Sequence, residues 1–301
     1  MDQLAVGTAV ETEHGHDVAV SAPGALCGPP GVLQGGLSTA VLARAAVAVD
    51  DGRPSRVVAR LHRPTPTDTE LVATVTAPSD DTEAPVASAR STWQVATSVA
   101  GGPPDEPLVT GLVAIGGRAG DADDHDDLVD IALRDPLPRP QAVPAAPHCV
   151  VCGARNPDGL HLFPGWCPDG AVVEAWEGEE AQAGPGGTFV RPEVVAAILD
   201  CPTVWAARDH LRANGHGGAM LGGMDVTWYS RLPVGEAVRV GAVMDHADGR
   251  KIRARAGLVG RDGMLYAVAS CFQVGVATFP GADPDLDPFG DDLDEEEEGW
   301  S

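Results

Sequence analysis

The chain has little positive charge and few aromatic side chains. Of its 301 residues, 20 are Lys or Arg against 44 Asp or Glu, which gives a formal net charge of −24, and Lys251 is the single lysine. A nucleic-acid-binding surface requires clustered basic residues, and an anionic membrane surface attracts such clusters too. We therefore expect neither nucleic acid nor a membrane among the partners of this protein.

Long apolar runs and a secretory leader are also lacking. No stretch approaches the roughly 20 apolar residues of a membrane span. The N-terminus MDQLAVGTAVETEHGHD has no basic segment followed by an apolar one. The six cysteines are widely spaced, except for Cys149 and Cys152. This distribution is typical of free thiols in a reducing compartment, so we expect a cytoplasmic protein.

The negative charge is unevenly placed. Ten of the acidic residues lie from Gly281 onward, where there is no Lys or Arg, so the rest of the chain carries −14. Residues 277–301, which include GDDLDEEEEGW, are predicted to be an acidic disordered tail. Residues 117–147 are rich in Asp, Pro and Ala and are predicted to be a linker with one helical turn in DDLVDIAL.

Two regions, residues 1–116 and 148–276, show the same order of signals. Each has a strand, a glycine-rich loop, an apolar helix and four strands separated by turn residues. In the first region these are His16–Ala22, GPPGVLQGG, Leu37–Val49, Ser55–Arg63, Glu70–Ala77, Pro85–Val95 and Leu108–Gly116. In the second they are Ala171–Trp176, AGPGGTF, Arg191–Ala206, Met224–Leu232, Ala237–Asp245, Ile252–Val259 and Met264–Val274.

Local matches support an internal duplication. Arg63-Pro64-Thr65-Pro66 before ELVATV resembles Arg231-Leu232-Pro233 before AVRVGAV, and Trp93-Gln94-Val95 resembles Phe272-Gln273-Val274. The two pairs differ in spacing, so the strand registers of the first region stay open. We expect an α+β protein in which two antiparallel sheets each wrap around a central helix and join edge to edge.

The second helix, RPEVVAAILDCPTVWA, carries one carboxylate in an apolar segment. Pro192 suits a first helical turn, and Val194, Val195, Ile198 and Leu199 form one apolar stripe. A buried carboxylate needs a partner or a shifted pKa, and such groups are frequent in functional sites. Spacing alone leaves two possibilities: Asp200 belongs to a site, or it faces solvent.

The pattern as a whole resembles the hot-dog fold, as two fused copies of the acyl-CoA thioesterase-like superfamily. The residues that carry this resemblance are GVLQGGLSTAVLARAA, LDCPTVWA, the R-x-P turn and HCVVCGARNPDGLHLF from His148 to Phe163. The resemblance covers about residues 15–116 and 147–276. It implies that the fused pair replaces the usual dimer of single domains, and that two such chains associate as a homodimer.

The resemblance also implies a site. Phenylacetyl-CoA-type thioesterases have H-G-G at the start of the helix, where a backbone N–H polarises the thioester carbonyl, and an acid further along. Here Gln34 replaces the histidine before Gly35 and Gly36, and Ala43 stands where the acid would be. The second helix keeps the acid, Asp200, but begins with Arg191 and Pro192.

Each half thus keeps what the other has lost, and we expect one composite site between the helices. In it, Gly35 or Gly36 donates to the oxyanion, Asp200 is the acid/base, and Gln34, Arg191 and Arg231 bind substrate. The expected activity is hydrolysis of an acyl-CoA or a related thioester. The alternatives are a non-catalytic module that binds an acyl group or a partner, and a hot-dog hydratase or dehydratase, for which His62 is the candidate histidine.

Metal and cofactor are not expected. Cys149 and Cys152, with His148, His161 and Cys167 nearby, have part of the spacing of a structural zinc site, but the second short pair is missing. Cys201 follows Asp200 and is expected to be a packed thiol, because the sequence shows no neighbouring base that would activate it. The arginines of the second region either meet coenzyme A phosphates or balance nearby carboxylates.

Overall fold

The computed structural model describes residues 4–79, 82–103, 105–117, 120, 122–136, 142–282, 285 and 287–289. Within them the α-helices are α1 (Gly35–Val49), α2 (Asp126–Ala132), α3 (Pro192–Trp205) and α4 (Arg208–Ala213), and the 3₁₀ turns are η1 (Gly24–Leu26), η2 (Ala122–His125) and η3 (Glu180–Gln182). The strands up to α2 are β1 (Ala5–Val6), β2 (Val10–Thr12), β3 (Gly15–Ser21), β4 (Pro54–Leu61), β5 (Glu70–Thr76), β6 (Ser91–Val99) and β7 (Val109–Ile115). Those after α2 are β8 (Gly165–Trp166), β9 (Val172–Glu177), β10 (Gly218–Trp228), β11 (Ala237–Asp248), β12 (Lys251–Gly260) and β13 (Leu265–Val276).

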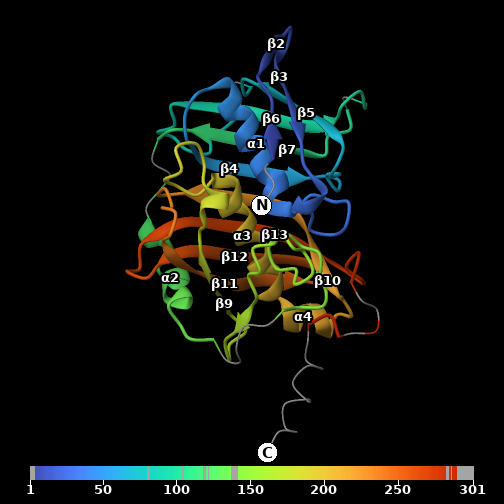
Figure 1. The fold of residues 1–301 in the computed structure, drawn as a ribbon, viewed down its shortest axis with the longest axis vertical. Coiled ribbons are helices and arrows are strands. Elements are labelled where there is room, and N and C mark those ends of the chain that lie inside the picture. Colours follow the sequence, from blue (N-terminus) through green and yellow to red (C-terminus); the bar gives the residue numbers. More distant parts are fainter. Residues whose placement is uncertain are drawn as a thin grey trace, which may run out of the picture.

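These strands form one continuous sheet in which neighbours run antiparallel. Its order is β1-β3-β5-β6-β7-β4-β10-β13-β12-β11-β9-β8, and β2 pairs with β3 beside this path. The halves join where β4 pairs with β10, from Arg56 opposite Thr227 to Arg60 opposite Gly223. In Figure 1 the strands of the first half, blue to green, lie in the upper part, and most of the second half, yellow-green to red, lies in the lower part.

The two halves have the same topology. The series β3, α1, β4, β5, β6, β7 corresponds to β9, α3, β10, β11, β12, β13, and the sheet order β3-β5-β6-β7-β4 recurs as β9-β11-β12-β13-β10. The R-x-P turns precede β5 and β11, which correspond. The match of Trp93-Gln94-Val95 with Phe272-Gln273-Val274 was wrong, because these segments lie in β6 and β13, whose counterparts are β12 and β7.

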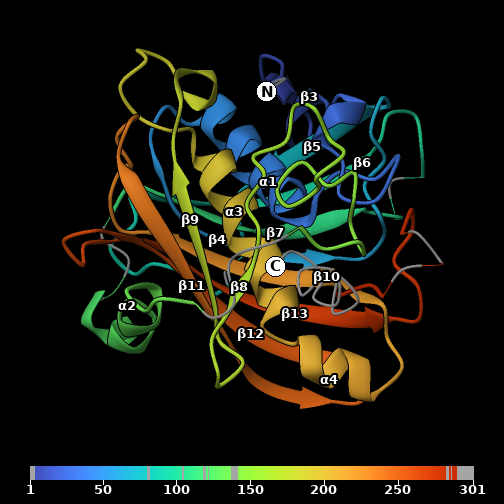
Figure 2. The same ribbon diagram turned by 60° about the horizontal axis from the view of Figure 1, so that its bottom comes forward.

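Helices α1 and α3 lie side by side (Figure 2), each against strands of its own half. Gly36 makes this approach possible. A Cβ atom at that position would lie 2.3 Å from the carbonyl oxygen of Ala196 on α3, well inside van der Waals contact. Counted from the first residues of the helices, Gly35 and Pro192, Ala43 on α1 corresponds to Asp200 on α3.

Two strands differ from their predicted limits. β6 begins at Ser91 rather than Pro85, because residues 85–90 form a turn in which the Ala89 amide donates to the Val86 carbonyl (3.0 Å). β10 begins at Gly218 rather than Met224 and continues through a bulge between Leu221 and Gly223. The glycines around this bulge hid the first part of the strand from a pattern based on alternation.

The region predicted as a linker contributes to the core. Within it α2 lies against β11 and β12, and Leu128 and Ala132 are fully buried there. Gly241 of β11 allows the contact, because a Cβ atom there would lie 2.6 Å from the Ala132 nitrogen. This part of residues 117–147 is therefore a packed element as well as a connection. The Asp-rich composition of the region hid the apolar face of α2 in the sequence.

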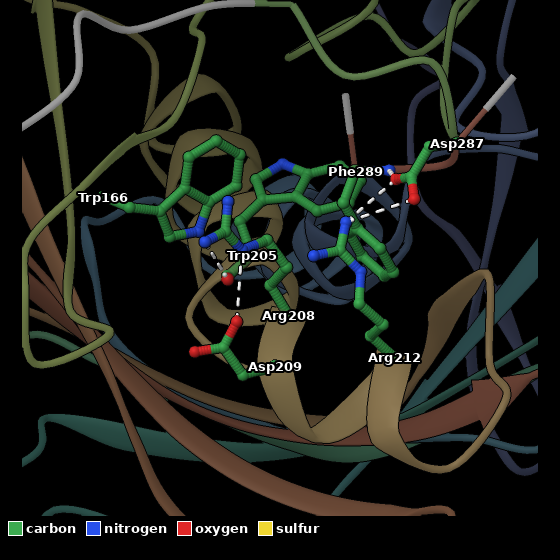
Figure 3. Close-up of polar contacts among 7 residues, drawn as sticks. All are labelled: Trp166, Trp205, Arg208, Asp209, Arg212, Asp287 and Phe289. Atoms are coloured by element: carbon green, nitrogen blue, oxygen red, sulfur yellow. Dashed lines mark hydrogen bonds and ion pairs between the residues drawn. The ribbon is translucent and has the colours of Figure 1, made fainter. Parts of the chain in front are cut away.

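Part of the predicted disordered tail is also packed. Phe289 is 1 % exposed, and its ring lies 6.3 Å from that of Trp205 (Figure 3). The Asp287 carboxylate accepts hydrogen bonds from Arg212 at 3.0 and 3.2 Å, and the Pro288 carbonyl accepts one from the Ala145 amide (3.1 Å). The expectation of disorder was therefore wrong for residues 287–289. The run DDLDEEEEGWS lies outside the described residues.

Membrane-spanning helices are not found. A search of the described residues gives no helix long and apolar enough to cross a bilayer.

Candidate active site

A cavity of about 260 Å³ lies where the start of α1 meets the middle of α3. Both halves of the chain and the segment before β8 contribute to its wall. The apolar and sulfur-bearing lining residues are Val32, Leu33, Leu61, Ala146, Cys149, Cys152, Cys201, Val204, Trp205, Ala219, Met220, Leu221, Val274 and Phe279. The polar ones that bear on its chemistry are Gln34, Asp200 and Gln273.

Asp200 supplies a carboxylate to this cavity. The residue is 6 % exposed. Its Oδ2 accepts hydrogen bonds from the Gly36 amide (3.0 Å) and from Gln34 Nε2 (2.8 Å), and its Oδ1 accepts one from Gln273 Nε2 (2.8 Å). A carboxylate has about four lone-pair sites. Three of them are used here, so one site on Oδ1 remains for another donor.

Burial changes the proton affinity of this carboxylate. It raises the pKa of Asp200 from 3.8 to about 6, while the hydrogen bonds from Gln273 and Gly36 oppose the rise. The carboxylate is thus ionised in most molecules at neutral pH, although it lies away from bulk water. A pKa near the working pH suits a residue that takes up and returns a proton.

Gln273 and Thr203 belong to the site although the sequence did not point to them. Gln273 Nε2 donates to Asp200 Oδ1 and to Thr203 Oγ1 (3.0 Å), and Thr203 Oγ1 donates to the Asp200 carbonyl (2.7 Å). The carboxylate oxygen can only accept, which fixes the orientation of the Gln273 amide. Gln273 Oε1 is buried and has no partner among the described residues.

A signal for Gln273 existed in the alternation of β13. Ala269, Cys271 and Gln273 share one face of that strand, and all three are buried. A polar residue in register with two buried neighbours predicts an inward-facing amide, which needs a partner inside the protein. The nearness of Asp200 could not be inferred from β13 alone, because it depends on how α3 crosses the sheet.

Gln34 was expected to bind substrate, but its polar atoms are bonded within the protein. Its Oε1 accepts from the Leu37 amide (2.9 Å) and so caps α1, while its Nε2 donates to Asp200 Oδ2 and to the Ala197 carbonyl (3.2 Å). Both polar atoms are therefore bonded within the protein, and the side chain is 2 % exposed. In this structure Gln34 orients Asp200 and links the two helices.

The two glycines differ in what their amides do. The Gly36 amide donates to Asp200 itself. Gly35 is the first residue of α1, where amides have no partner within the helix, and it lines the cavity. No hydrogen bond from its amide is found among the described residues. A Cβ atom at Gly35 would lie 2.6 Å from Asp200 Oδ2, so only glycine leaves room for this carboxylate.

The structure therefore brings Gln34, Gly35, Gly36 and Asp200 together, and it places the two arginines elsewhere. Arg191 is 4 % exposed and donates to the carbonyls of Ala181 and Ala183, both at 3.1 Å. Arg231 lies 3.9 Å above the ring of Phe189.

These arginines line a second cavity of about 720 Å³, at the start of α3. There Arg44 of α1 forms an ion pair with Glu193 of α3 (2.5 Å), and Pro192 takes the position that Gly35 has in the first cavity. Burial lowers the pKa of Arg53, which also lines this cavity, and the charge of Arg231 adds to the effect. The second cavity has no counterpart of Asp200, because Ala43 stands at that position.

The six cysteines are free and buried. Among the described residues one group of possible metal ligands is found. It comprises Cys149, Cys152 and Cys201, whose Sγ atoms all lie within 4.8 Å of one another. Cys167 packs in another cluster, and His161 Nε2 is 2.9 Å from the Asn156 carbonyl oxygen, so neither belongs to this group.

Comparisons with known proteins identify the fold. No family model and no curated protein matches the sequence. Among solved structures, a proposed thioesterase from Novosphingobium aromaticivorans is 14 % identical, with 90 % of this chain and 99 % of that chain aligned and a TM-score of 0.59. The acyl-CoA thioesterase II TesB2 from Mycobacterium marinum is 13 % identical, with 93 % and 98 % aligned and a TM-score of 0.57. The TesB protein of Mycobacterium avium subspecies paratuberculosis is 15 % identical, with 88 % and 95 % aligned and a TM-score of 0.53. The chain thus has the double hot-dog fold of these thioesterases over about nine-tenths of its length.

Proposed function

We propose that this protein hydrolyses the thioester of a short acyl group, such as an acyl-CoA, with Asp200 as its general base. The observation that carries the proposal is a pair of acceptors on two residues that line one apolar cavity. One is the remaining lone-pair site on Asp200 Oδ1, and the other is the unpartnered Oε1 of Gln273. Their surroundings suit a water molecule, which needs two to four polar partners to be held in a buried place.

The geometry supports the following course. A water held by Asp200 and Gln273 attacks the carbonyl carbon of the thioester and gives a proton to Asp200. The tetrahedral intermediate then collapses with cleavage of the C–S bond, and the leaving thiolate takes that proton from Asp200. Hydrolysis thus returns the carboxylate to its ionised form and releases a carboxylic acid and a thiol.

The Gly35 amide is the donor for the developing oxyanion. Sequence reasoning left Gly35 and Gly36 equally suitable, and the hydrogen bond from Gly36 to Asp200 favours Gly35. An N–H at the start of a helix carries a partial positive charge, which stabilises negative charge in front of it. The loss of one such donor typically costs about 10²- to 10³-fold in rate.

The size of the cavity supports a short acyl group. Its volume of about 260 Å³ lies below the range of about 300–1,000 Å³ that is typical of pockets for drug-sized ligands. Its lining is mainly apolar, which suits an acyl chain better than a sugar or a polar head. The Mycobacterium marinum neighbour is an acyl-CoA thioesterase, which supports a thioester as the substrate class.

The alternative functions fit the site less well. A hydratase of this fold would need an imidazole beside the acid. His62 also lines the cavity, but its Nε2 lies 2.8 Å from Thr110 Oγ1, and the Asp200 carboxylate accepts from amide groups among the described residues. A module that only binds acyl groups would not require a desolvated carboxylate next to an unsatisfied acceptor. That function remains as one outcome of the test below.

The test compares wild type with Asp200→Asn against acyl-CoAs of increasing chain length. We expect turnover that is greatest for short chains, and a loss of about 10²- to 10⁴-fold in kcat in the variant, as for removal of a general base. Glu193→Gln is the matched control, because it neutralises another buried carboxylate on α3. Saturable binding without turnover in the wild type would instead establish a binding module, and equal activity in Asp200→Asn would contradict the mechanism.

A further inference from the structure

Three thiols that lie far apart in the sequence meet beside the cavity. Cys149 and Cys152 come from the segment before β8, and Cys201 comes from α3. All three are buried. The Sγ atoms of Cys149 and Cys201 are 3.7 Å apart. Two thiolates bound to one tetrahedral Zn²⁺ at 2.3 Å lie about 3.8 Å from each other. The observed separation therefore needs almost no adjustment to hold that ion.

The turn around Cys149 is built to present its sulfur. The Val151 amide donates to Cys149 Sγ (3.4 Å), and the Gly153 amide donates to the Cys149 carbonyl (2.9 Å). A Cβ atom at Gly153 would lie 2.4 Å from the Cys149 nitrogen, so this tight turn requires glycine. Backbone amides directed at sulfur are the kind of outer-shell donors that orient a ligating thiolate.

A second buried group near the thiols is an acid without a partner. Glu174 on β9 is fully buried, and neither of its carboxylate oxygens has a hydrogen-bond partner among the described residues. It lies near enough to Cys149 for their charges to interact. When they are deprotonated, a buried acid and three buried thiols in one neighbourhood are stabilised by a cation bound between or beside them.

We propose that Cys149, Cys152 and Cys201 form a three-thiolate site for Zn²⁺, with the fourth coordination position open to the cavity. The cavity includes all three residues in its wall, which supports a fourth ligand from inside it. Three protein ligands and one exchangeable position are the arrangement of an open zinc site rather than a closed structural one. None of these ligands is a reacting group in the proposed hydrolysis, but Gln34 Nε2, which holds Asp200, also donates to Cys201 Sγ (3.7 Å).

The chemistry of the ligands favours zinc over harder cations. Thiolates select Zn²⁺ or Cu⁺ over Mg²⁺ and Ca²⁺, which prefer oxygen. The sequence led to the opposite expectation, because a second short pair of ligands after Cys149 and Cys152 is missing. The fold supplies the third ligand from a helix instead, and the two ligand-bearing segments are thereby tied together next to Asp200.

The test uses the full-length protein, stripped of metal with a chelator and kept reduced with a phosphine. Co²⁺ is the probe, because tetrahedral Co²⁺ absorbs in the visible range and its thiolate bonds absorb in the near ultraviolet. We expect one equivalent to bind with a tetrahedral, sulfur-ligated spectrum and to be displaced by Zn²⁺. A small thiol added afterwards should increase the near-ultraviolet band by about one third, as a fourth sulfur joins three.

Variants identify the ligands. Cys201→Ser should weaken Zn²⁺ binding by at least about 100-fold, more than the removal of an outer-shell partner costs. Cys271→Ser is the matched control, since Cys271 is equally buried on β13 and lies outside the group. It should bind as the wild type does. If Cys201→Ser does not fold, the Co²⁺ spectrum of the wild type decides by itself.

Three results would overturn the proposal. The first is a folded, reduced wild type that takes up far less than one equivalent of metal. The second is sulfur-ligated Co²⁺ that persists unchanged in Cys201→Ser. The third is a Cys149–Cys201 disulfide, found by mass spectrometry in protein purified without reductant, together with no metal uptake after reduction. This last result would assign the three thiols to redox chemistry. An unchanged spectrum with added thiol would disprove the open fourth position.

Discussion

The two cavities between α1 and α3 lie at corresponding ends of two halves with the same topology, but they are built from different residues. In the first, Gln34 and Gly36 of α1 face Asp200 of α3. At the counterpart positions the second has Arg191 and Glu193 facing Ala43. An acid bonded to amides stands at one end of the helix pair, and an ion pair between Arg44 and Glu193 stands at the other.

This difference shows which features a site needs and which the fold needs. Both ends keep the close approach of the helices and both keep buried charge. Only the first keeps an acid that retains an unused lone pair beside an apolar cavity, and a glycine that exposes an amide. In the second, Pro192 has no N–H to donate, and Glu193 has an arginine for a partner. At the second end, the ion pair between Arg44 and Glu193 links the two helices.

The largest expected effect comes from Gly36→Ala. The added Cβ would overlap the Ala196 carbonyl and force α1 away from α3, which should lower the free energy of unfolding by about 3 kcal/mol and move the Gly36 amide away from Asp200. Urea denaturation and thioester turnover measure the two consequences. At the counterpart position Glu193→Ala adds no atoms but strands the buried Arg191, so it should lower stability without lowering turnover per folded molecule. An equal loss of turnover per folded molecule would show that the two ends do not differ in function.

Gln273→Ala separates the chemistry of the first cavity from its stability. Without the amide, Asp200 Oδ1 loses its donor and the proposed water loses its second acceptor. We expect kcat to fall by about 100-fold, within the range of general-base contributions, and KM to change little. Gln94→Ala is the control, because Gln94 is exposed on β6 and is the residue that the sequence had matched with Gln273. A large rise in KM alone would assign Gln273 to substrate binding instead.

Glu174 is a buried acid without hydrogen bonds among the described residues, and Asp200 is a buried acid that accepts three. Comparing the two tests whether hydrogen bonds, rather than burial, set the pKa of Asp200 apart. Burial raises the pKa of Glu174 from 4.5 to about 8, and the charge of Cys149 adds to the rise. The folded protein therefore keeps this proton up to about pH 8, whereas the unfolded chain releases it above about pH 4.5. The stability that this group contributes is complete below pH 4.5 and is lost as the pH rises through 8.

The measurement for Glu174 is the free energy of unfolding of wild type and Glu174→Gln between pH 5 and 8, with a chelator present. The variant has no proton to lose, so the difference between the two proteins should change by up to about 1.4 kcal/mol per pH unit. Thioester turnover per folded molecule should be unchanged. A constant difference over the whole range would mean that Glu174 is ionised in the folded protein.

Local signals were sufficient for α1 and α3 and for the candidate residues that meet between them. The stripe of Val194, Val195, Ile198 and Leu199 marks a buried helix, so the one acid on it was a candidate from its spacing. The paired glycines at the start of α1 supplied the complementary half. The correspondence of Ala43 with the acid position came from the resemblance to phenylacetyl-CoA-type thioesterases, and the observed helix starts, Gly35 and Pro192, agree with it.

Features that depend on contacts between distant segments could not be predicted in this way. Gln273 and Cys201 were visible as residues, but their partners come from other elements, and strand alternation does not give the crossing of α3 over β13. The register of β6 was misplaced for the same reason. Phe289 shows a further limit of prediction from composition. Residues 277–301 were judged by their overall acidity, which hid one apolar residue that is buried against Trp205.

The smallest effect is expected from Arg44→Met, which breaks the ion pair of the second cavity. The Arg44 side chain is 33 % exposed and Glu193 is buried, and Arg191 stays within 3.5 Å of the same carboxylate oxygen. Because Arg191 still compensates the charge, we expect a loss of only about 1 kcal/mol, below the cost of stranding a buried charge. The kcat/KM for thioesters should not change, since the ion pair lies at the other end of the helices. A fall in kcat/KM without a matching loss of folded protein would mean that the second cavity takes part in substrate binding. The two cavities would then act together on one substrate, and the second would not be an inactive counterpart of the first.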